Sequence, residues 1–388
     1  MAGGRAVDTV LRRSDDPVVL IGAEPHAPYH RPEISKGYLH GTVGLADIGL
    51  HPRGHYASTD RVRHRASVPA VGIDTDAREV LLADGSAEPY AKLLIATGGR
   101  PTRLGCPGGN LSGIRYLRTV EDADAIRTAF TRRPRIVAVG SGLVGLEVAA
   151  AARSAGLEVD VVDAAERLLP ALGPAIGEAV RAIHENAGVR FRFGATVERF
   201  EGTDAVSAVV LDDGARIPAE LVIVGIGITP DTAWLPTDLR GEQRGAIATD
   251  ALGRMAVADV HAAGDVCRWE HPHFGPLTTE HEAVAQNQGM HVAMAMLGRD
   301  RPFRQIPFAW SDQYEHSLQV VGVASAPLTD DIVTFPAGDG TVSLYLHDGA
   351  VTGAATVDAN DSAKRLTKRM HAGLPVPMSS ELTDDLSA

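Results

Sequence analysis

The chain contains little cysteine, and the cysteines present are poorly placed for thiol chemistry. Only two occur among 388 residues, Cys106 and Cys267. Two isolated thiols cannot build a disulfide framework or a four-ligand zinc site. Cys106 lies in a Pro- and Gly-rich link, and Cys267 has no second cysteine near it in the sequence. The sequence therefore disfavours a disulfide reductase and predicts two buried or idle thiols.

Long apolar runs and an excess of positive charge are also missing. No apolar run approaches the roughly 20 residues of a membrane span, and the first fifteen residues lack the apolar segment of a signal peptide. The formal net charge of −12 argues against a general nucleic-acid binder. His271 and His273 flank a proline without further ligands at useful spacing, so we expect no metal site. These absences predict a soluble cytoplasmic protein.

Glycine, by contrast, is abundant, with 41 residues. The most informative stretch is the G-x-G-x-x-G pattern of residues 140–145. The apolar run 136–139 precedes it as an expected buried strand, and 146–155 follows as an expected helix. A second expected strand, 159–162, ends on Asp163, at the distance where a ribose-binding acid is found. This context predicts a dinucleotide-binding unit.

Each residue of the pattern has a physical role in this interpretation. Gly140 permits the tight turn, Gly142 lets the backbone approach a pyrophosphate, and Gly145 lets the helix pack close to the strand. The helix N-terminus supplies N–H groups and partial positive charge for the phosphates. Asp163 would accept hydrogen bonds from ribose hydroxyls and repel a 2′-phosphate, and the two alanines that follow offer no cation. The pattern therefore favours NADH over NADPH.

The N-terminal region repeats part of this unit. Gly3 matches the third glycine, residues 6–13 the helix, residues 17–21 the second strand, and Glu24 its terminal acid. The first strand and the first two glycines have no counterpart. We therefore expect the natural protein to begin about ten residues upstream, the length of a strand plus its glycine turn.

Two further strands run into glycine turns. Residues 93–99 and 221–227 are buried apolar strands that end in glycine, and Pro101 and Pro230 follow them. Each proline would stop a helix and fix the exit of the chain. We interpret both segments as crossings between two dinucleotide-binding domains.

The pattern changes near residue 303. Four spaced strands and a basic helix, Ser362–Ala372, predict an α+β module there. The expected strands are Gln319–Val323, Ile332–Phe335, Val342–His347 and Val351–Val357. The sequence thus predicts an α/β protein with two Rossmann-like domains and a C-terminal α+β domain. The expected boundaries are 1–105 with 230–304, then 106–229, then 305–388.

Several blocks of the chain together form a recognisable pattern. They are Pro28–Lys36, Ala96–Gly98, Gly140–Glu147, Gly264–Val266, Glu280 with His281, Gln288 with Gly289, and Trp310–Tyr314. These blocks resemble one family, the NADH-dependent ferredoxin reductases of oxygenase systems. The resemblance covers nearly the whole chain and implies a glutathione-reductase-like flavoprotein. FAD would bind the first domain and NADH the second, and electrons would pass to a [2Fe–2S] ferredoxin that serves an oxygenase or cytochrome P450.

The resemblance implies a set of cofactor contacts. Glu24 is similar to the acid on the FAD adenosine ribose, Arg31 and Lys36 to flavin and phosphate contacts, and Asp265 to a ribityl contact. The helix from about Ala283 would point its N-terminus at the flavin pyrimidine edge. The full set is Gly3, Glu24, Arg31, Lys36, Thr97, Gly98, Gly140, Gly142, Gly145, Asp163, Gly227, Gly264, Asp265, Glu280, His281 and Trp310.

The resemblance also implies three catalytic residues. Glu147 lies two residues past the third glycine and would pair with Lys36 near the nicotinamide, while Trp310 would lie near the flavin ring. Such a pair would orient the nicotinamide for hydride transfer. Two positions depart from the family pattern, because Glu282 stands where a tryptophan is usual and His30 where an acid is more common.

Other functions stay open at this stage. The acceptor could be rubredoxin, the chain could be a redox sensor similar to apoptosis-inducing factor, or a truncated chain could be inactive. Arginines 61, 63 and 65 and the cations of the 362–372 helix could steer an acidic ferredoxin. The alternative for both patches is an ordinary solvated surface. The sequence does not indicate the oligomeric state.

Overall fold

The computed structural model describes residues 1–387, which divide into two compact units. Unit one comprises Met1–Pro32, Gly44–Arg100 and Ile228–Gln305. Unit two comprises Glu33–Val43, Pro101–Gly227 and the chain from Ile306 onward. None of the helices in these 387 residues is long and apolar enough to cross a bilayer.

Unit one is built around two helices and two short parallel ladders. Helix α1 (Ala2–Arg13) packs along α7 (Glu282–Met296). A Cβ at Gly289 would lie 2.2 Å from the carbonyl oxygen of Ala2, so glycine lets the helices approach closely. The ladders pair β1 (Val18–Ile21) with β2 (Val62–Arg65), and β6 (Leu93–Ile95) with β18 (Val260–Ala262). Within residues 1–387 no strand joins the two ladders.

The rest of unit one consists of small sheets and short helical turns. Most strands of the two three-stranded sheets alternate buried and exposed residues, as expected for sheets covered on one face. Trp269 is fully buried in the core beneath them. The elements are α3 (Leu45–Ile48), β3 (Ala70–Asp74), β4 (Glu79–Leu82), β5 (Ala87–Pro89), β7 (Gly99–Pro101), β16 (Ile228–Pro230), β17 (Ile247–Thr249), β19 (Cys267–His271) and β20 (Gly275–Thr278).

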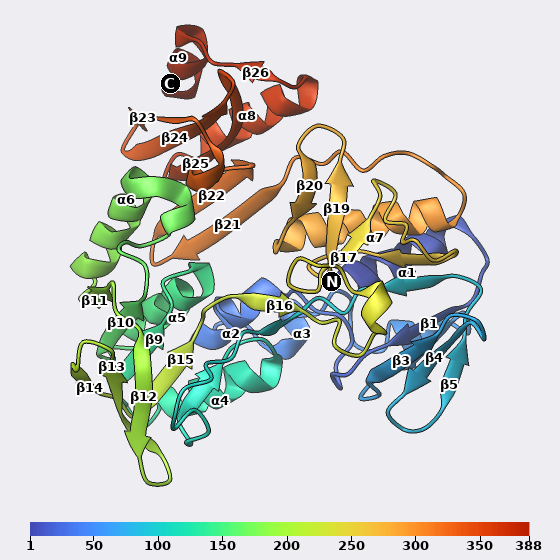
Figure 1. The fold of residues 1–388 in the computed structure, drawn as a ribbon, viewed down its shortest axis with the longest axis horizontal. Coiled ribbons are helices and arrows are strands. Elements are labelled where there is room, and N and C mark those ends of the chain that lie inside the picture. Colours follow the sequence, from blue (N-terminus) through green and yellow to red (C-terminus); the bar gives the residue numbers. More distant parts are fainter. Residues whose placement is uncertain (388) are drawn as a thin grey trace. The chain divides into compact units, whose positions relative to one another are not determined.

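Unit two contains a five-stranded parallel sheet in the order β11-β10-β9-β15-β8, visible in Figure 1. Its central strands are buried at every position, which explains their continuous apolar sequences. The elements are β8 (Ile114–Tyr116), α4 (Val120–Phe130), β9 (Ile136–Val139), α5 (Leu143–Ser154), β10 (Val159–Asp163), α6 (Gly173–Asn186), β11 (Arg190–Phe193) and β15 (Leu221–Val224). A separate antiparallel sheet joins β12 (Val197–Gly202), β13 (Val206–Leu211) and β14 (Arg216–Pro218).

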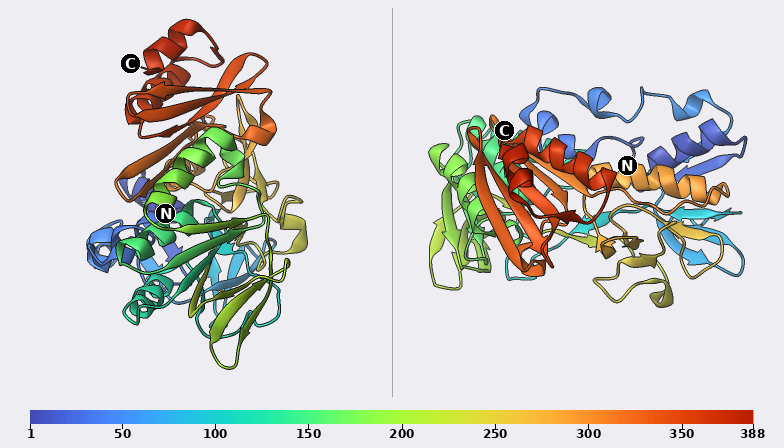
Figure 2. Two further views of the ribbon diagram at one scale, coloured as in Figure 1. Left: turned by 90° about the vertical axis from the view of Figure 1, so that its left-hand side faces the viewer. Right: turned by 90° about the horizontal axis from the view of Figure 1, so that it is seen from above.

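The C-terminal part of unit two is an antiparallel sheet with two helices. Figure 2 shows α8 and α9 in red beside the orange-red strands, and α8 packs on β22 and β25. Side chains of α6 and of this sheet share one core, in which Tyr345 is fully buried. The elements are β21 (Phe308–Gln313), β22 (His316–Gly322), β23 (Asp331–Ala337), β24 (Gly340–His347), β25 (Ala350–Val357), α8 (Asn360–Ala372), β26 (Val376–Pro377) and α9 (Ser380–Ser387).

One segment is grouped differently from the sequence expectation, which placed it with residues 1–105. Glu33–Val43 belongs to unit two and carries the short helix α2 (Gly37–His40). Helix α2 packs on α4, and the Tyr38 hydroxyl donates a hydrogen bond to Asp124 at 3.0 Å. These contacts tie the segment to the part of unit two that contains the five-stranded parallel sheet. The division of unit two into domains 106–229 and 305–388 stays a proposal.

Candidate functional site

The G-x-G-x-x-G turn links β9 to α5, and two of its glycines leave no space for a side chain. Gly140 has a φ of +101°, and a Cβ there would lie 2.4 Å from the Gly225 carbonyl oxygen. A Cβ at Gly145 would lie 2.2 Å from the carbonyl oxygen of Gly140. Gly140 therefore makes the turn, and Gly145 lets the helix pack against it.

Gly142 differs because the space beside it is open. It caps α5 with extended backbone angles, and the nearest atom to an added Cβ is the Gly225 carbonyl oxygen at 3.9 Å. Within residues 1–387 no side chain caps the first turn of α5, and that turn contains no acid. Free N–H groups beside open space are what a pyrophosphate requires. Gly227 also borders open space, with no atom within 4 Å of an added Cβ.

Asp163 ends β10 and lies at the glycine turn. Its carboxylate accepts hydrogen bonds from the backbone N–H and hydroxyl of Ser141, each at 2.6 Å, and from the backbone N–H of Ala165 at 2.8 Å. The acid is therefore held in place while still half-buried. A carboxylate offers about four lone-pair directions, so it can also accept from ribose hydroxyls.

A buried ion pair lies next to this turn. Lys36 Nζ is 2.9 Å from Glu147 Oε1, which the resemblance implied. Ser35 Oγ donates to Glu147 Oε2 at 2.5 Å, and Ser311 Oγ donates to Glu147 Oε1 at 2.6 Å. Lys36 also approaches the Asp312 carboxylate at 3.6 Å. The sequence analysis did not identify Ser35, Ser311 or Asp312 as partners, although all three fall within family-like blocks.

In unit one, Glu24 and Arg31 contact each other. Arg31 Nη2 donates to Glu24 Oε1 at 2.6 Å, and the Tyr29 hydroxyl donates to Glu24 Oε2 at 2.6 Å. Both charged side chains are 28% exposed. The resemblance implied a ribose contact for Glu24 and a flavin or phosphate contact for Arg31, and the structure places the two side chains side by side.

The other residues of unit one for which the resemblance implied contacts with FAD lie at turns and at the start of a helix. Thr97 Oγ1 donates to the Asp231 carbonyl oxygen at 2.8 Å, and Gly98 has a φ of +68°. The N–H of Gly264 donates to the buried Gln288 side chain at 2.7 Å, just before Asp265. These bonds fix the backbone of two glycine turns, at Gly98 and Gly264.

The start of α7 carries an unusual pair. His281 is its N-cap residue, directly after Glu280, and burial lowers the pKa of His281. His30 Nδ1 lies 3.2 Å from Glu282 Oε1 in the first turn. The two departures from the family pattern are thus partners in space.

Comparison with known proteins identifies the family. The sequence matches the pyridine nucleotide-disulphide oxidoreductase family over residues 1–323 and the reductase C-terminal family over residues 308–386. The chain is 34% identical to the ferredoxin–NAD(+) reductase component of the anthranilate 1,2-dioxygenase system of Burkholderia cepacia, covering 96% of this chain and 92% of the relative. The chain belongs to the pyridine nucleotide-disulphide oxidoreductase family.

Two other relatives have informative names. A rubredoxin–NAD(+) reductase of Pseudomonas putida is 35% identical, covering 78% of this chain and 79% of the relative. The crystal structure of the covalent putidaredoxin reductase–putidaredoxin complex matches with a TM-score of 0.90 and 29% identity, over 100% of this chain and 93% of the other. The α/β class with two dinucleotide-binding folds and a C-terminal reductase domain is confirmed.

Members of this family use FAD and NAD(H), and the residues of unit one fit FAD in kind. The N-cap residues of α1 and α7, Met1 and His281, make no side-chain capping hydrogen bond to their helices. These N–H groups suit phosphate and flavin oxygens. Arg31 supplies a cation and Asp265 an acceptor. Gly3 has room beside it, since a Cβ there would lie 3.6 Å from Ala96 Cβ.

Lys36 and Trp310 belong to unit two, as Glu147 does. Trp310 is half-buried on β21 and stacks on Phe308 with ring centroids 6.1 Å apart. Their predicted roles toward the flavin stay proposals.

The open space at Gly142 and the closed space at Gly145 predict opposite effects of alanine. Gly142→Ala should leave the urea midpoint of unfolding unchanged and weaken NAD⁺ binding by about tenfold, because its Cβ would occupy the phosphate position. Gly145→Ala should cost about 1–3 kcal/mol of stability, because its Cβ would overlap the turn. Urea unfolding and calorimetric NAD⁺ titration measure both. Unchanged NAD⁺ affinity in a folded Gly142→Ala variant would contradict the proposed phosphate position.

The cysteines should be inert in the native family fold. Complete burial raises the pKa of the Cys267 thiol to about 12, and burial also raises the pKa of Cys106. At pH 8 the thiolate fraction of Cys267 would then be on the order of 10⁻⁴. We expect a thiol reagent to label at most Cys106 in native protein and both cysteines after unfolding. Rapid labelling of Cys267 in native protein would show that it is accessible.

Two groups of side chains lie close enough to bind a metal ion, and neither was foreseen. One comprises Asp8, His51 and His55, and the other is exposed at Asp330, His347 and Asp348. His51 already contacts Asp8 at 2.7 Å, and Arg5 lies 3.6 Å from the other carboxylate oxygen. Oδ1 of Asp8 is thus paired with His51, while the buried Oδ2 has the ion pair with Arg5 and no hydrogen bond.

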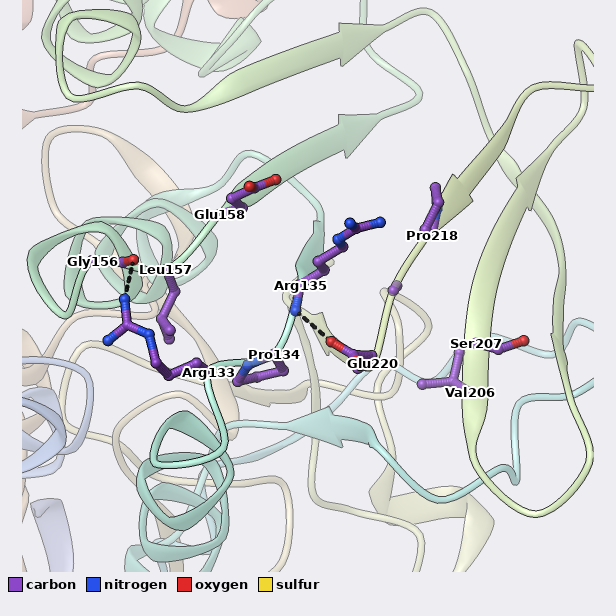
Figure 3. Close-up of a pocket in the computed structure, with 11 residues that line it drawn as sticks. Arg133, Pro134, Arg135, Gly156, Leu157, Glu158, Val206, Ser207, Pro218 and Glu220 are labelled. Atoms are coloured by element: carbon purple, nitrogen blue, oxygen red, sulfur yellow. Dashed lines mark hydrogen bonds between the residues drawn. The ribbon is translucent and has the colours of Figure 1, made fainter.

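A hollow of about 640 Å³, shown in Figure 3, opens at the amino ends of the strands of the five-stranded parallel sheet. The glycine turn lies at the other end of these strands. Its lining comes from the segments that immediately precede β9, β10 and β15, together with part of β13. Arg133 donates to the Gly156 carbonyl oxygen at 3.0 Å there. Because cofactors bind at the carboxyl ends of parallel strands, this hollow is not the dinucleotide site.

Proposed function

We propose that the chain takes electrons from NADH through FAD and passes them to a [2Fe–2S] ferredoxin that serves an oxygenase or cytochrome P450. The observation that carries this proposal is the largely buried ion pair of Lys36 and Glu147. Glu147 lies two residues past the last glycine of a turn that has room for a pyrophosphate. The relatives named above are ferredoxin and rubredoxin reductases, which supports the same electron path.

Several residues of unit two have a part in this proposal. The turn at Gly142 and the N-terminus of α5 bind the pyrophosphate, and Asp163 binds the adenosine ribose. Lys36, held by Glu147, would contact and orient the nicotinamide for hydride transfer. FAD, when bound, supplies the change from two-electron to one-electron chemistry. Trp310 is the residue of the C-terminal sheet that we place near the flavin.

The acceptor is a small acidic iron–sulfur protein in this proposal, with rubredoxin as the alternative. The cationic patches expected from the sequence are mostly paired within the chain. Arg63 and Arg65 contact Glu88, and Arg369 contacts Asp385 of α9. Paired cations steer an acidic partner weakly, because the field of each pair falls off faster than that of a charge. We therefore do not assign the docking surface to either patch.

The test is NADH-dependent reduction of cytochrome c through a purified [2Fe–2S] ferredoxin, using protein loaded with FAD. We expect activity with the ferredoxin and a strong loss in a Lys36→Met variant. Activity with rubredoxin alone would select the rubredoxin reductase. A slow turnover with every carrier and a long-lived reduced flavin–NAD⁺ complex would support the redox sensor. Failure to retain FAD would support the inactive chain.

A cytoplasmic location stays a prediction, and cell fractionation tests it.

A further inference from the structure

A chain of hydrogen bonds leads away from Glu147 into unit two. Ser311 Oγ donates to Glu147 Oε1 at 2.6 Å, and Gln313 Nε2 donates to Ser311 Oγ at 2.9 Å. His184 Nε2 lies 2.7 Å from Gln313 Oε1, and the Tyr314 hydroxyl lies 3.3 Å from His184 Nδ1. The chain thus connects α5 through β21 to α6.

Three members of this chain are buried, and Tyr314 at its end is half-buried. His184 is 0% exposed, Ser311 is 1% and Gln313 is 4%. Burying a polar group costs free energy unless a hydrogen bond replaces its water. The three side chains satisfy one another, and their line ends at the carboxylate of Glu147. Apolar side chains would fill the same space without needing hydrogen-bond partners. Packing alone therefore does not explain why three polar side chains occupy it.

The direction of every bond follows from chemistry. An ionised Glu147 can only accept, so the Ser311 hydroxyl donates to it and must accept from the Gln313 amide nitrogen. The amide oxygen of Gln313 then accepts from His184 Nε2–H. Burial lowers the pKa of His184, so its ring is neutral and Nδ1 accepts from Tyr314. All four donors therefore point toward Glu147.

Aligned donors reinforce one another, because each bond polarises the next. Hydrogen bonds donated to a carboxylate favour its ionised form. Ser311 donates to Oε1, the oxygen that Lys36 also contacts, while Ser35 donates to Oε2. A charged and fixed Glu147 in turn fixes the ammonium group of Lys36.

We propose that Tyr314, His184, Gln313 and Ser311 form a positioning relay that holds the Glu147 carboxylate in one orientation and thereby sets the position of Lys36 for NADH. The inference rests on the proposed function, in which Lys36 and Glu147 orient the nicotinamide. The relay residues themselves are positioning residues. The C-terminal sheet therefore acts on the NADH step.

The test compares Ser311→Ala with Ser311→Thr, which keeps the hydroxyl. We expect Ser311→Ala to lower the limiting rate of flavin reduction by NADH about tenfold and to change the Kd for NADH by less than about threefold, because Glu147 and Lys36 lose their fixed positions. Ser311→Thr should restore most of the rate. Gln313→Leu and His184→Phe should act in the same direction and more weakly.

Ser343→Ala is the matched control, because Ser343 is a fully buried serine of the same sheet that bonds Thr334 at 2.8 Å. It should leave the reduction rate and the Kd for NADH unchanged. The relay is wrong if folded Ser311→Ala, or folded Gln313→Leu where Ser311→Ala does not fold, has its flavin reduced at the rate of the unmodified protein. A normal reduction rate in Glu147→Gln would instead overturn the proposed function.

Discussion

Replacing Glu147 with leucine should destabilise the protein by about 3–5 kcal/mol, the usual cost of removing one partner of a buried ion pair. The change leaves the Lys36 ammonium, which is 13% exposed, without its 2.9 Å partner. It also removes the acceptor of the Ser35 and Ser311 hydroxyls. The Asp312 carboxylate lies 3.6 Å from Lys36 Nζ, but its side chain is 55% exposed. It therefore replaces little of the lost interaction with Glu147. The shift of the urea midpoint at constant m-value measures the loss.

The double variant Lys36→Met with Glu147→Leu is the control. It removes both charges, and replacing a buried ion pair by apolar residues of similar volume is often nearly neutral. We expect it to recover at least about 2 kcal/mol relative to Glu147→Leu alone. A double variant less stable than Glu147→Leu would show that the ammonium group does not depend on this carboxylate.

The local structure around the glycine turn could be predicted because its signals lie within a few residues. The buried strand 136–139 is β9 as predicted, since four consecutive apolar residues fit a strand covered on both faces. The helix begins at Leu143, three residues earlier than expected. Gly142 adopts the N-cap conformation, so the third glycine lies inside the first turn rather than before it.

The long-range partners could not be predicted, because nothing local marks them. His184 and Gln313 are 129 positions apart, and each alone is an ordinary polar residue. The same holds for His30 and Glu282, which were noted separately as departures and meet at 3.2 Å. Contacts of this kind depend on how α6 and β21, or residue 30 and α7, pack. Only the tertiary structure specifies that packing.

The last helix illustrates another limit. Four cations on the 362–372 helix suggested a positive surface that could steer an acidic partner. Helix α9 brings Asp385 to Arg369 at 2.8 Å, and Lys364 pairs with Asp361 at 2.9 Å within α8. A charge count along one helix does not include the charges of the element that packs on it.

Replacing Asp163 with alanine and Ala164 with arginine should reverse the coenzyme preference. Loss of the carboxylate removes charge-assisted hydrogen bonds to the ribose, each worth about 1.5–3 kcal/mol. It also removes the repulsion of a 2′-phosphate, and the new guanidinium can bind that phosphate. We expect kcat/KM for NADH to fall about 100-fold and the NADH to NADPH ratio to fall by about 1,000-fold or more. Steady-state kinetics with both coenzymes measure this.

The structure requires a control, because Asp163 also holds the glycine turn through Ser141 and Ala165. Asp163→Asn loses the charge and keeps one of the two acceptor oxygens, so it can accept from the N–H of Ser141 or of Ala165 but not from both. It should lower NADH use without the gain in NADPH use. Ser141→Ala removes one of the two Ser141 donors and should change the ratio by less than about threefold. An equal loss with both coenzymes in the double variant would mean that Asp163 supports the turn and does not read the ribose. A selective gain with NADPH would mean that the carboxylate at the end of β10 determines coenzyme choice through its charge.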